Sequence, residues 1–201
     1  MYTDIETLYN TTIARNPACW MAYTIRGVAY GNLGNYRKAI EDLNKAIEIK
    51  PDFVVAYYDR GNLYRALGDD KQAIEDYGRA IENNPGCAEA YNNRGNAYSS
   101  LGNYRQAIED YGRAIKIKPD FAEAYINRGT EYNGLGNYKQ AIEDLNRAIK
   151  IKPDFAEAYL NRGIVYLTQG DNISGCRDAQ KACSLGVCKL LEFAKGKGLC
   201  R

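Results

Sequence analysis

The sequence predicts an all-α protein in which helix-turn-helix units stack into a solenoid that ends in a C-terminal capping helix. The first observation is a repeat: residues 88–121 and residues 122–155 carry nearly the same sequence at an offset of 34 residues, and such a period is typical of solenoids. The second is the recurrence of Leu-Gly and Pro in the copies, which are signals for helix ends. The third is the use of 18 tyrosines against 4 phenylalanines, which repetition of one tyrosine-rich unit explains.

The whole chain, residues 1–201, is expected to form this single solenoid, because its length is sufficient for a substantial core. It is expected to contain, in chain order, a half repeat, five copies and a cysteine-containing cap: 1–19, 20–53, 54–87, 88–121, 122–155, 156–189 and 190–201.

Each copy is expected to hold two helices. In residues 20–53, the first helix covers 21–33 and ends at Leu33-Gly34, since glycine after a helix adopts the left-handed C-cap conformation. The second helix covers 36–49 and ends before Pro51, which cannot continue a helix. Similar stops recur along the chain: Leu67-Gly68, Pro85, Leu101-Gly102, Pro119, Leu135-Gly136, Pro153 and, in the last copy, Gln169-Gly170.

Glycine also occurs in the middle of every first helix, where it costs about 1 kcal/mol relative to alanine. A cost that recurs in every copy indicates that another backbone packs closely at this point. These glycines are Gly27, Gly61, Gly95, Gly129 and Gly163. We interpret the tyrosine that follows each of them by one helical turn as a structural residue of the packing: Tyr30, Tyr64, Tyr98, Tyr132 and Tyr166.

A second repeated pair carries charge. Every first helix has an arginine directly before its glycine: Arg26, Arg60, Arg94, Arg128 and Arg162. Every second helix has an aspartate at one fixed position: Asp42, Asp76, Asp110, Asp144 and Asp178. Opposite charges at matched positions of two packed helices predict a series of structural ion pairs.

This pattern resembles the tetratricopeptide repeat, which has small residues, aromatic residues and a proline at fixed positions. One copy matches at six of these positions: Tyr91, Gly95, Tyr98, Ala107, Ala114 and Pro119. The resemblance extends over roughly residues 4–185 and implies a right-handed α-solenoid. The repeated arginine departs from the family pattern, which often has leucine there.

The N-terminal segment is interpreted as a second helix without its first helix. Thr3 and Glu6 have the spacing of a capping box, and the helix is expected to extend to about Arg15. A half repeat leaves an apolar face uncovered, so we expect either that the chain is a piece of a longer protein or that it forms a homo-oligomer through this half repeat. Residues 2–23 also resemble the junction after the membrane half of certain bacterial, glycosyltransferase-like membrane proteins. That resemblance implies a location outside the cytoplasm.

The C-terminal segment is expected to cap the solenoid with one short helix over Val187–Lys195. Leu190, Leu191 and Phe193 are its expected apolar contacts. A terminal cap is required because the last repeat would otherwise leave its hydrophobic face in water.

Four of the six cysteines lie near this cap: Cys176, Cys183, Cys188 and Cys200. A thiolate zinc site and a redox site are disfavoured because no C-x-x-C pair is present. Cys176 and Cys183 share a helix and lie about 10 Å apart, too far to pair with each other.

Two disulfide arrangements stay open: Cys183–Cys188 with Cys176–Cys200, or Cys176–Cys188 with Cys183–Cys200. Either favours an extracytoplasmic, periplasmic location, because disulfides persist in oxidising compartments. Reduced thiols in a cytoplasmic protein are the alternative. Cys19 and Cys87 are interpreted as small buried residues.

Composition argues against several function classes. The chain has no histidine, which removes serine–histidine catalysis and histidine-ligated metals. We therefore expect no enzyme activity, no cofactor and no metal. The net charge of +2, from 27 basic and 25 acidic residues, gives no indication of nucleic-acid binding. No apolar run approaches the roughly 18 residues that direct membrane insertion requires.

The concave groove formed by the first helices is the candidate binding site. Asparagines recur there, and their amides can both donate to and accept from an extended peptide backbone. The candidate groove residues are Tyr58, Asp59, Asn62, Asn93, Asn96, Asn127 and Asn161. The pattern resembles the asparagine ladder of a tetratricopeptide superhelix attached to a sugar transferase, although hydrogen bonding between repeats is an alternative role. The groove lacks the basic residues of the chaperone-carboxylate clamp found in other members of the family.

The sequence thus predicts a non-catalytic protein–protein interaction scaffold that binds an extended peptide segment in its concave groove. Two alternatives are an accessory, substrate-guiding domain of a membrane glycosyltransferase-like protein and a self-assembly module. The expected partner is a protein or peptide in each case.

Overall fold

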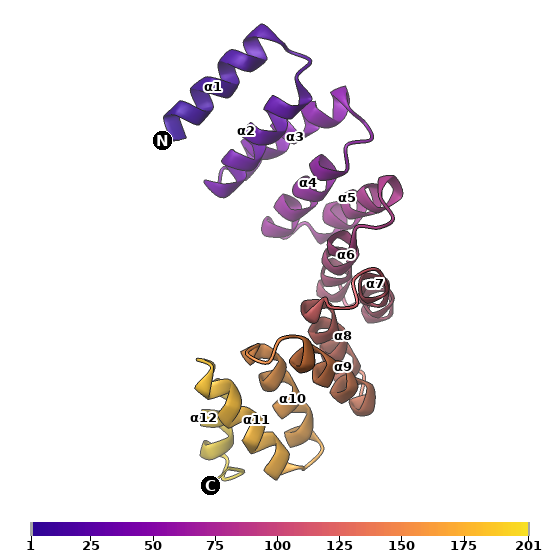
Figure 1. Cartoon of the computed structure of the whole chain (residues 1–201), viewed down its shortest axis with the longest axis vertical. Helices are drawn as coiled ribbons and strands as arrows, with labels where there is room; N and C mark the ends of the chain where they lie inside the picture. Colours follow the sequence, from indigo (N-terminus) through magenta and orange to yellow (C-terminus); the bar gives the residue numbers. More distant parts are fainter. Residues whose placement is uncertain (1, 201) are drawn as a thin grey trace. The chain divides into compact units, whose positions relative to one another are not determined.

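A computed structural model describes residues 2–200 of the chain, with side chains from residue 7 onward. The predicted capping box of Thr3 and Glu6 lies outside the described side chains. The described residues form twelve α-helices and no strand (Figure 1). The helices are α1 (Tyr2–Arg15), α2 (Trp20–Asn32), α3 (Tyr36–Ile49), α4 (Val54–Ala66), α5 (Asp70–Asn83), α6 (Ala88–Ser100), α7 (Tyr104–Ile117), α8 (Ala122–Gly134), α9 (Tyr138–Ile151), α10 (Ala156–Thr168), α11 (Asn172–Ser184) and α12 (Lys189–Gly196).

The helices belong to two compact units, unit 1 (Met1–Gly102) and unit 2 (Asn103–Arg201). In unit 1, α2 packs on α3 and α4 packs on α5, and α1 and α6 lie against α2 and α5. In unit 2, α8 packs on α9 and α10 packs on α11, while α7 lies against α8 and α12 against α11. Each unit is therefore a stack of helix pairs, as the all-α repeat prediction requires.

The helix ends follow the predicted signals. Four second helices, α3, α5, α7 and α9, have the predicted bounds, and α11 ends one residue earlier than predicted. The first helices begin and end one residue earlier than predicted, as α2 shows. After α2, Gly34 has a φ of 75° and donates its N–H to the carbonyl of Gly31 at 3.0 Å. Asn35 donates to the carbonyl of Tyr30 at 2.9 Å. This pair of bonds is a Schellman motif, which satisfies the last carbonyls of the helix.

The mid-helix glycines mark close helix contacts. A Cβ atom on Gly61 would lie 2.8 Å from Cε1 of Tyr77, a side chain that is fully buried. Glycine is thus required where the ring of Tyr77 packs against the backbone of α4. Alanines with no exposed surface, such as Ala73 and Ala80 in α5, fill the facing helix. The backbones of the two helices in a pair consequently approach each other closely at these positions.

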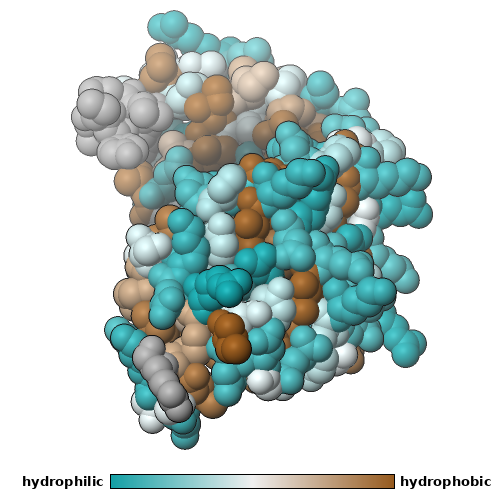
Figure 2. Space-filling view, turned by 60° about the horizontal axis from the view of Figure 1, so that its bottom comes forward, coloured by the Kyte–Doolittle hydropathy of each residue, from teal (hydrophilic) through white to brown (hydrophobic). Residues whose placement is uncertain are grey.

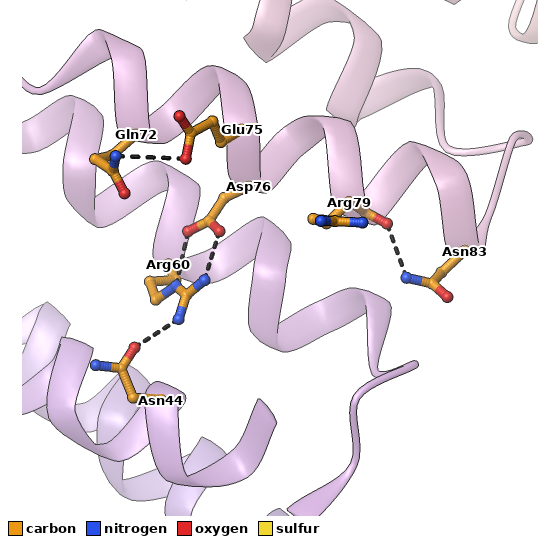
Figure 3. Close-up of polar contacts among 7 residues, drawn as sticks. All are labelled: Asn44, Arg60, Gln72, Glu75, Asp76, Arg79 and Asn83. Atoms are coloured by element: carbon orange, nitrogen blue, oxygen red, sulfur yellow. Dashed lines mark hydrogen bonds and ion pairs between the residues drawn. The ribbon is translucent and has the colours of Figure 1, made fainter. Parts of the chain in front are cut away.

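The structure contains ion pairs of the predicted kind between first and second helices. Arg60 donates from Nε and Nη2 to the two carboxylate oxygens of Asp76, at 2.8 and 2.6 Å (Figure 3). The same two-bond geometry joins Arg26 to Asp42, Arg128 to Asp144 and Arg162 to Asp178. Only 9% of the Asp144 side chain is exposed, and its hydrogen bonds are the main cause of a raised Arg128 pKa. Each pair fixes a first helix onto its second helix.

The same arginines also reach the preceding repeat. The third nitrogen of Arg60, Nη1, donates to Oδ1 of Asn44 at 2.6 Å, as Figure 3 shows. Arg26 and Arg162 bond in the same way to Asn10 and Asn146. The equivalent positions before the two remaining arginines are glycines, Gly78 and Gly112, beside Arg94 and Arg128 respectively. The interfaces between successive repeats therefore differ in this one contact.

Tyrosine rings flank the guanidinium groups. The guanidinium carbon of Arg128 lies 5.9 Å from the ring centres of both Tyr125 and Tyr132. Comparable tyrosine pairs flank Arg26, Arg94 and Arg162. These cation–π contacts agree with the interpretation of the repeated tyrosines as structural residues and account for their abundance.

The C-terminal cap is shorter than predicted, and two of its three predicted apolar contacts are present: Leu190 is buried and Leu191 packs against the same cluster. Helix α12 begins at Lys189 rather than Val187, and Leu190 and Ala194 are its buried residues. The prediction for Phe193 was wrong: 57% of its surface is exposed, because it lies on the outer face of the helix, while Ala194 turns inward. Figure 2 shows a largely hydrophilic surface on the face in view, with separate hydrophobic patches.

Two disulfides hold the cap. Cys176 is bonded to Cys200 and Cys183 to Cys188, with Cα–Cα distances of 5.5 and 4.0 Å. This is the nested arrangement, the first of the two expected from the sequence. Cys19 and Cys87 are free and half-buried rather than fully buried.

The buried ion pairs predict a clear stability effect. Replacing Asp144→Asn should lower the free energy of unfolding by about 3 kcal/mol, because Arg128 would keep its charge without its carboxylate. Chemical denaturation followed by circular dichroism measures this loss. Asp154→Asn, at an exposed loop carboxylate, is the matched control and should change stability by less than about 0.5 kcal/mol. Equal effects of the two variants would contradict the structural role of the pair.

Candidate functional site

The candidate site in unit 1 lies on the first helices of three successive copies. Helices α2 and α4 contact each other, as do α4 and α6, so equivalent positions of the three helices lie side by side. We call the surface formed by their groove positions the unit-1 face. It includes Met21, Ile25 and Val28 from α2, Tyr58, Asp59 and Asn62 from α4, and Asn93 and Asn96 from α6.

Three of the predicted groove residues form one hydrogen-bond cluster. Nδ2 of Asn93 donates to the hydroxyl of Tyr58 and to Oδ1 of Asn62, each at 3.0 Å. The hydroxyl of the buried Tyr77 donates to the same Oδ1 of Asn62 at 2.7 Å. Both amide protons of Asn93 are thereby used in linking α6 to α4. This is the alternative role, bonding between repeats, that the sequence left open.

The hydroxyl of Tyr58 is part of the same cluster. It accepts a hydrogen bond from Asn93 and is also hydrogen-bonded to the side chain of Asn62. Burial is the main cause of a raised pKa of Tyr58, so this hydroxyl stays protonated at neutral pH. The cluster thus holds its polar side chains in fixed positions beside the neighbouring groove residues.

Asp59 lines a cavity of about 210 Å³ between the first two copies. Its other lining residues are Val28, Gly31, Asn32, Leu43, Asn62 and Leu63. Among the described residues, Asp59 makes no ion pair and no hydrogen bond. Burial raises the pKa of its carboxyl to about 6, since the charged form loses water without gaining a partner. The cavity therefore combines aliphatic walls with an uncompensated carboxylate.

An exposed apolar stripe on α2 lies beside this cavity. Met21, Ile25 and Val28 are spaced by four and three residues, so they follow one helix face, and 45%, 39% and 38% of their surfaces are exposed. Val28 belongs to both the stripe and the cavity wall. The asparagine pattern did not include these three residues. Their signal in the sequence is that apolar side chains occupy groove positions which are mostly polar in later copies.

Unit 2 contains the remaining predicted groove residues. Nδ2 of Asn161, on α10, donates to the hydroxyl of Thr130, on α8, at 3.1 Å, which again links successive first helices. Asn127 lies half-buried on α8. A cavity of about 70 Å³ lies between α8 and α10, and Oδ1 of Asn133 at its wall is buried without a hydrogen-bond partner among the described residues.

Family models of the tetratricopeptide repeat match most of the chain. One model for "Tetratricopeptide repeat" matches residues 20–53 and 88–121, a second covers 43–75, and one for "TPR repeat" matches 61–102 and 129–170. The chain belongs to the tetratricopeptide repeat family. The resemblance seen in its sequence is therefore confirmed, and no curated protein matched the chain significantly.

Solved structures show the same fold. A crystal structure of MamA protein is 28% identical, covers 89% of this chain and 94% of its own, and superposes with a TM-score of 0.75. A crystal structure of YrrB, described as "a TPR protein with an unusual peptide-binding site", is 20% identical, covers 94% and 97%, and has a TM-score of 0.77. A structure from Pseudomonas aeruginosa, pilF, is 19% identical over 92% of this chain and 88% of its own, with a TM-score of 0.76. Tetratricopeptide proteins are commonly scaffolds for protein interactions.

Two further observations concern other kinds of site. In residues 2–200, no helix has both the length and the apolar character to span a membrane. No group of three or more cysteine, aspartate or glutamate side chains in the described part of the chain is arranged to hold a metal ion.

The raised pKa of Asp59 predicts a pH-dependent stability. The folded pKa of about 6 lies above the ordinary 3.8, so stability falls as the pH rises through 6 and the buried carboxyl ionises. Asp59→Asn should therefore stabilise the protein by about 1–2 kcal/mol at pH 8 and leave stability unchanged at pH 4. Urea denaturation at both pH values measures the difference. Asp52→Asn, at an exposed carboxylate, is the control; a gain from Asp59→Asn that does not depend on pH would contradict the burial of a charged carboxylate.

Proposed function

We propose that this protein is a non-catalytic scaffold that binds an extended segment of a partner polypeptide on the first helices of its repeats. The observation that carries the proposal is the unit-1 face, where an exposed apolar stripe runs beside a fixed polar cluster. Apolar side chains supply binding free energy when they lose water, and polar groups in fixed positions orient a ligand. The peptide-binding site described for YrrB, a protein of the same fold, supports this function by analogy.

The links between repeats favour the same function. Asn93 and Asn161 join neighbouring first helices, so these helices form a preorganised surface. A preorganised surface loses little conformational entropy when a partner binds. A peptide would then contact side chains held by the stack, above all the apolar stripe and the hydroxyl of Tyr58.

Two alternative functions remain predictions from the sequence. One is a substrate-guiding domain attached to a membrane glycosyltransferase-like protein, and the other is a self-assembly module. Each of these functions is also a binding function rather than a catalytic one. The binding surface would be the first helices for the substrate-guiding domain and the half repeat for the self-assembly module. The scaffold function is preferred because it rests on exposed groups that the unit-1 face already places together.

The proposal can be tested with a variant in which a bulky charged side chain blocks the apolar stripe on α2. Peptides selected from a displayed random library against the folded protein provide the ligand, and fluorescence anisotropy measures their affinity. Val28→Arg should weaken binding by about tenfold or more, since it places a long charged side chain in the stripe and loses apolar contact worth about 1.4 kcal/mol.

Ile49→Arg is the matched control for this test. Ile49 is an equally exposed aliphatic residue, at 36% exposure, but it lies at the end of the second helix α3. Its replacement should leave the affinity within about twofold. If no peptide can be selected, or if both variants bind like the unmodified protein, the proposal fails.

We further propose that the protein functions in an oxidising, extracytoplasmic compartment such as a periplasm. Two disulfides close the cap, and such bonds persist where thiols are not kept reduced. Together they tie α12 to the last helix pair, at the end of the stack where fraying begins.

Alkylation of the free thiols tests whether the protein resides in an oxidising compartment. Protein isolated from its native cell, denatured without reduction and treated with iodoacetamide should gain two alkyl groups, on Cys19 and Cys87. The same sample reduced first should gain six, one for each cysteine. Intact mass spectrometry distinguishes the two results. Six groups without reduction would place the protein in a reducing compartment.

A further inference from the structure

The cavity at Asp59 has features that a general peptide groove does not need. Its carboxylate is half-buried and makes no ion pair and no hydrogen bond among the described residues, although the other four copies of this position carry Asn93, Asn127, Asn161 and Ile25. Ionised carboxylates are normally paired when they leave water, because burial without a partner is costly. An unpaired carboxylate at this position therefore points to a cation supplied from outside the chain.

The walls of the cavity restrict the shape of that cation. Val28, Leu43 and Leu63 provide aliphatic surface, and Gly31 lets the side chain of Leu63 pack closely against the backbone of α2. A hydrated metal ion gains nothing from such walls, and hard cations bind several oxygen ligands. A lysine side chain fits both the aliphatic walls and the carboxylate of the cavity, since its aliphatic stem can pack on apolar surface while its ammonium group reaches a charged partner.

We propose that the Asp59 cavity is a specificity pocket that binds a lysine side chain of the bound polypeptide, next to an apolar residue of the same segment on the Met21–Ile25–Val28 stripe. This inference rests on the proposed function, and it names the chemistry of the partner. The ammonium group donates to the carboxylate of Asp59, and the lysine stem lies along Val28 and Leu63. The apolar neighbour covers the stripe on α2.

The burial of Asp59 strengthens such a pair. Desolvation has already been imposed on the carboxylate by folding, as its raised pKa indicates. Binding of an ammonium group then adds an attraction without a further large loss of water from the carboxylate. A pair at a site of this kind contributes more than a fully exposed surface pair, for which about 0–1 kcal/mol is typical.

Nuclear magnetic resonance titration of the full chain, labelled with nitrogen-15, tests the inference. The probe is the acetylated peptide amide Ser-Ala-Leu-Lys-Ala-Ser. The comparison peptide replaces lysine with norleucine, which has the same stem without the charge. We expect the lysine peptide to bind about fivefold or more tightly than the norleucine peptide, with the largest shifts at the amides of Gly31, Asn32 and Asn62.

Two variants separate the pocket from general charge effects. Asp59→Asn removes the charge and keeps the shape, and the asparagines found at this position in three other copies indicate that the fold accepts it. The preference for lysine should disappear in Asp59→Asn and persist in Asp52→Asn, which removes an exposed carboxylate of the same unit.

Each result has a definite meaning. Equal affinities of the two peptides for the unmodified protein, or a lysine preference that survives Asp59→Asn, would overturn the lysine pocket. A preference lost equally in Asp52→Asn would also overturn it. In all of these cases, peptides selected from the library and blocked by Val28→Arg would still support the scaffold function, so failure of the pocket can be told from failure of the proposed function.

Discussion

The repeated arginine of the first helix is the interaction on which the rest of the structure depends. Its guanidinium group holds the aspartate of the second helix through two parallel hydrogen bonds, lies between tyrosine rings and, in three copies, reaches an asparagine of the preceding repeat. Guanidinium suits this role because its donors are arranged in a planar fork that matches a carboxylate. One side chain thus sets both the geometry within a helix pair and the contact between pairs.

Close packing of the helix pairs has a direct effect on the candidate binding surface. Because glycine and alanine occupy the contact between first and second helices, the large polar side chains of the first helices are left to the opposite face. There they bond to one another, as Asn93 does to Tyr58 and Asn62. The surface offered to a partner therefore includes polar side chains whose positions are fixed by the stack, whereas Asp59 has no hydrogen-bond or ion-pair partner among the described residues.

The local part of the structure was predictable from the sequence, and the part that depends on several helices was not. Glycine and proline determine helix ends through backbone conformation alone, so the bounds of the four second helices that precede a proline were correct, and the first-helix bounds were displaced by one residue. The Arg–Asp pairs could be predicted because both residues recur at fixed positions. The cavity at Asp59 could not, since its walls come from three helices. The exposure of Phe193 and the commitment of Asn93 to neighbouring repeats likewise depend on how helices rotate against one another.

The alternation of asparagine and glycine beneath the arginines gives the repeats unequal neighbours. Asn44 and Asn146 each accept a hydrogen bond across an interface, whereas Gly78 and Gly112 provide no side chain for that bond. In a linear array, stability is the sum of the repeats and of the joints between neighbours. The joints of the stack are consequently not equivalent: at the glycine joints, α5 on α6 and α7 on α8, the helices pack more extensively, whereas the asparagine joints add a hydrogen bond from the arginine. Copies with nearly identical sequences are therefore not interchangeable, because exchanging two of them would change which residue faces each arginine across a joint.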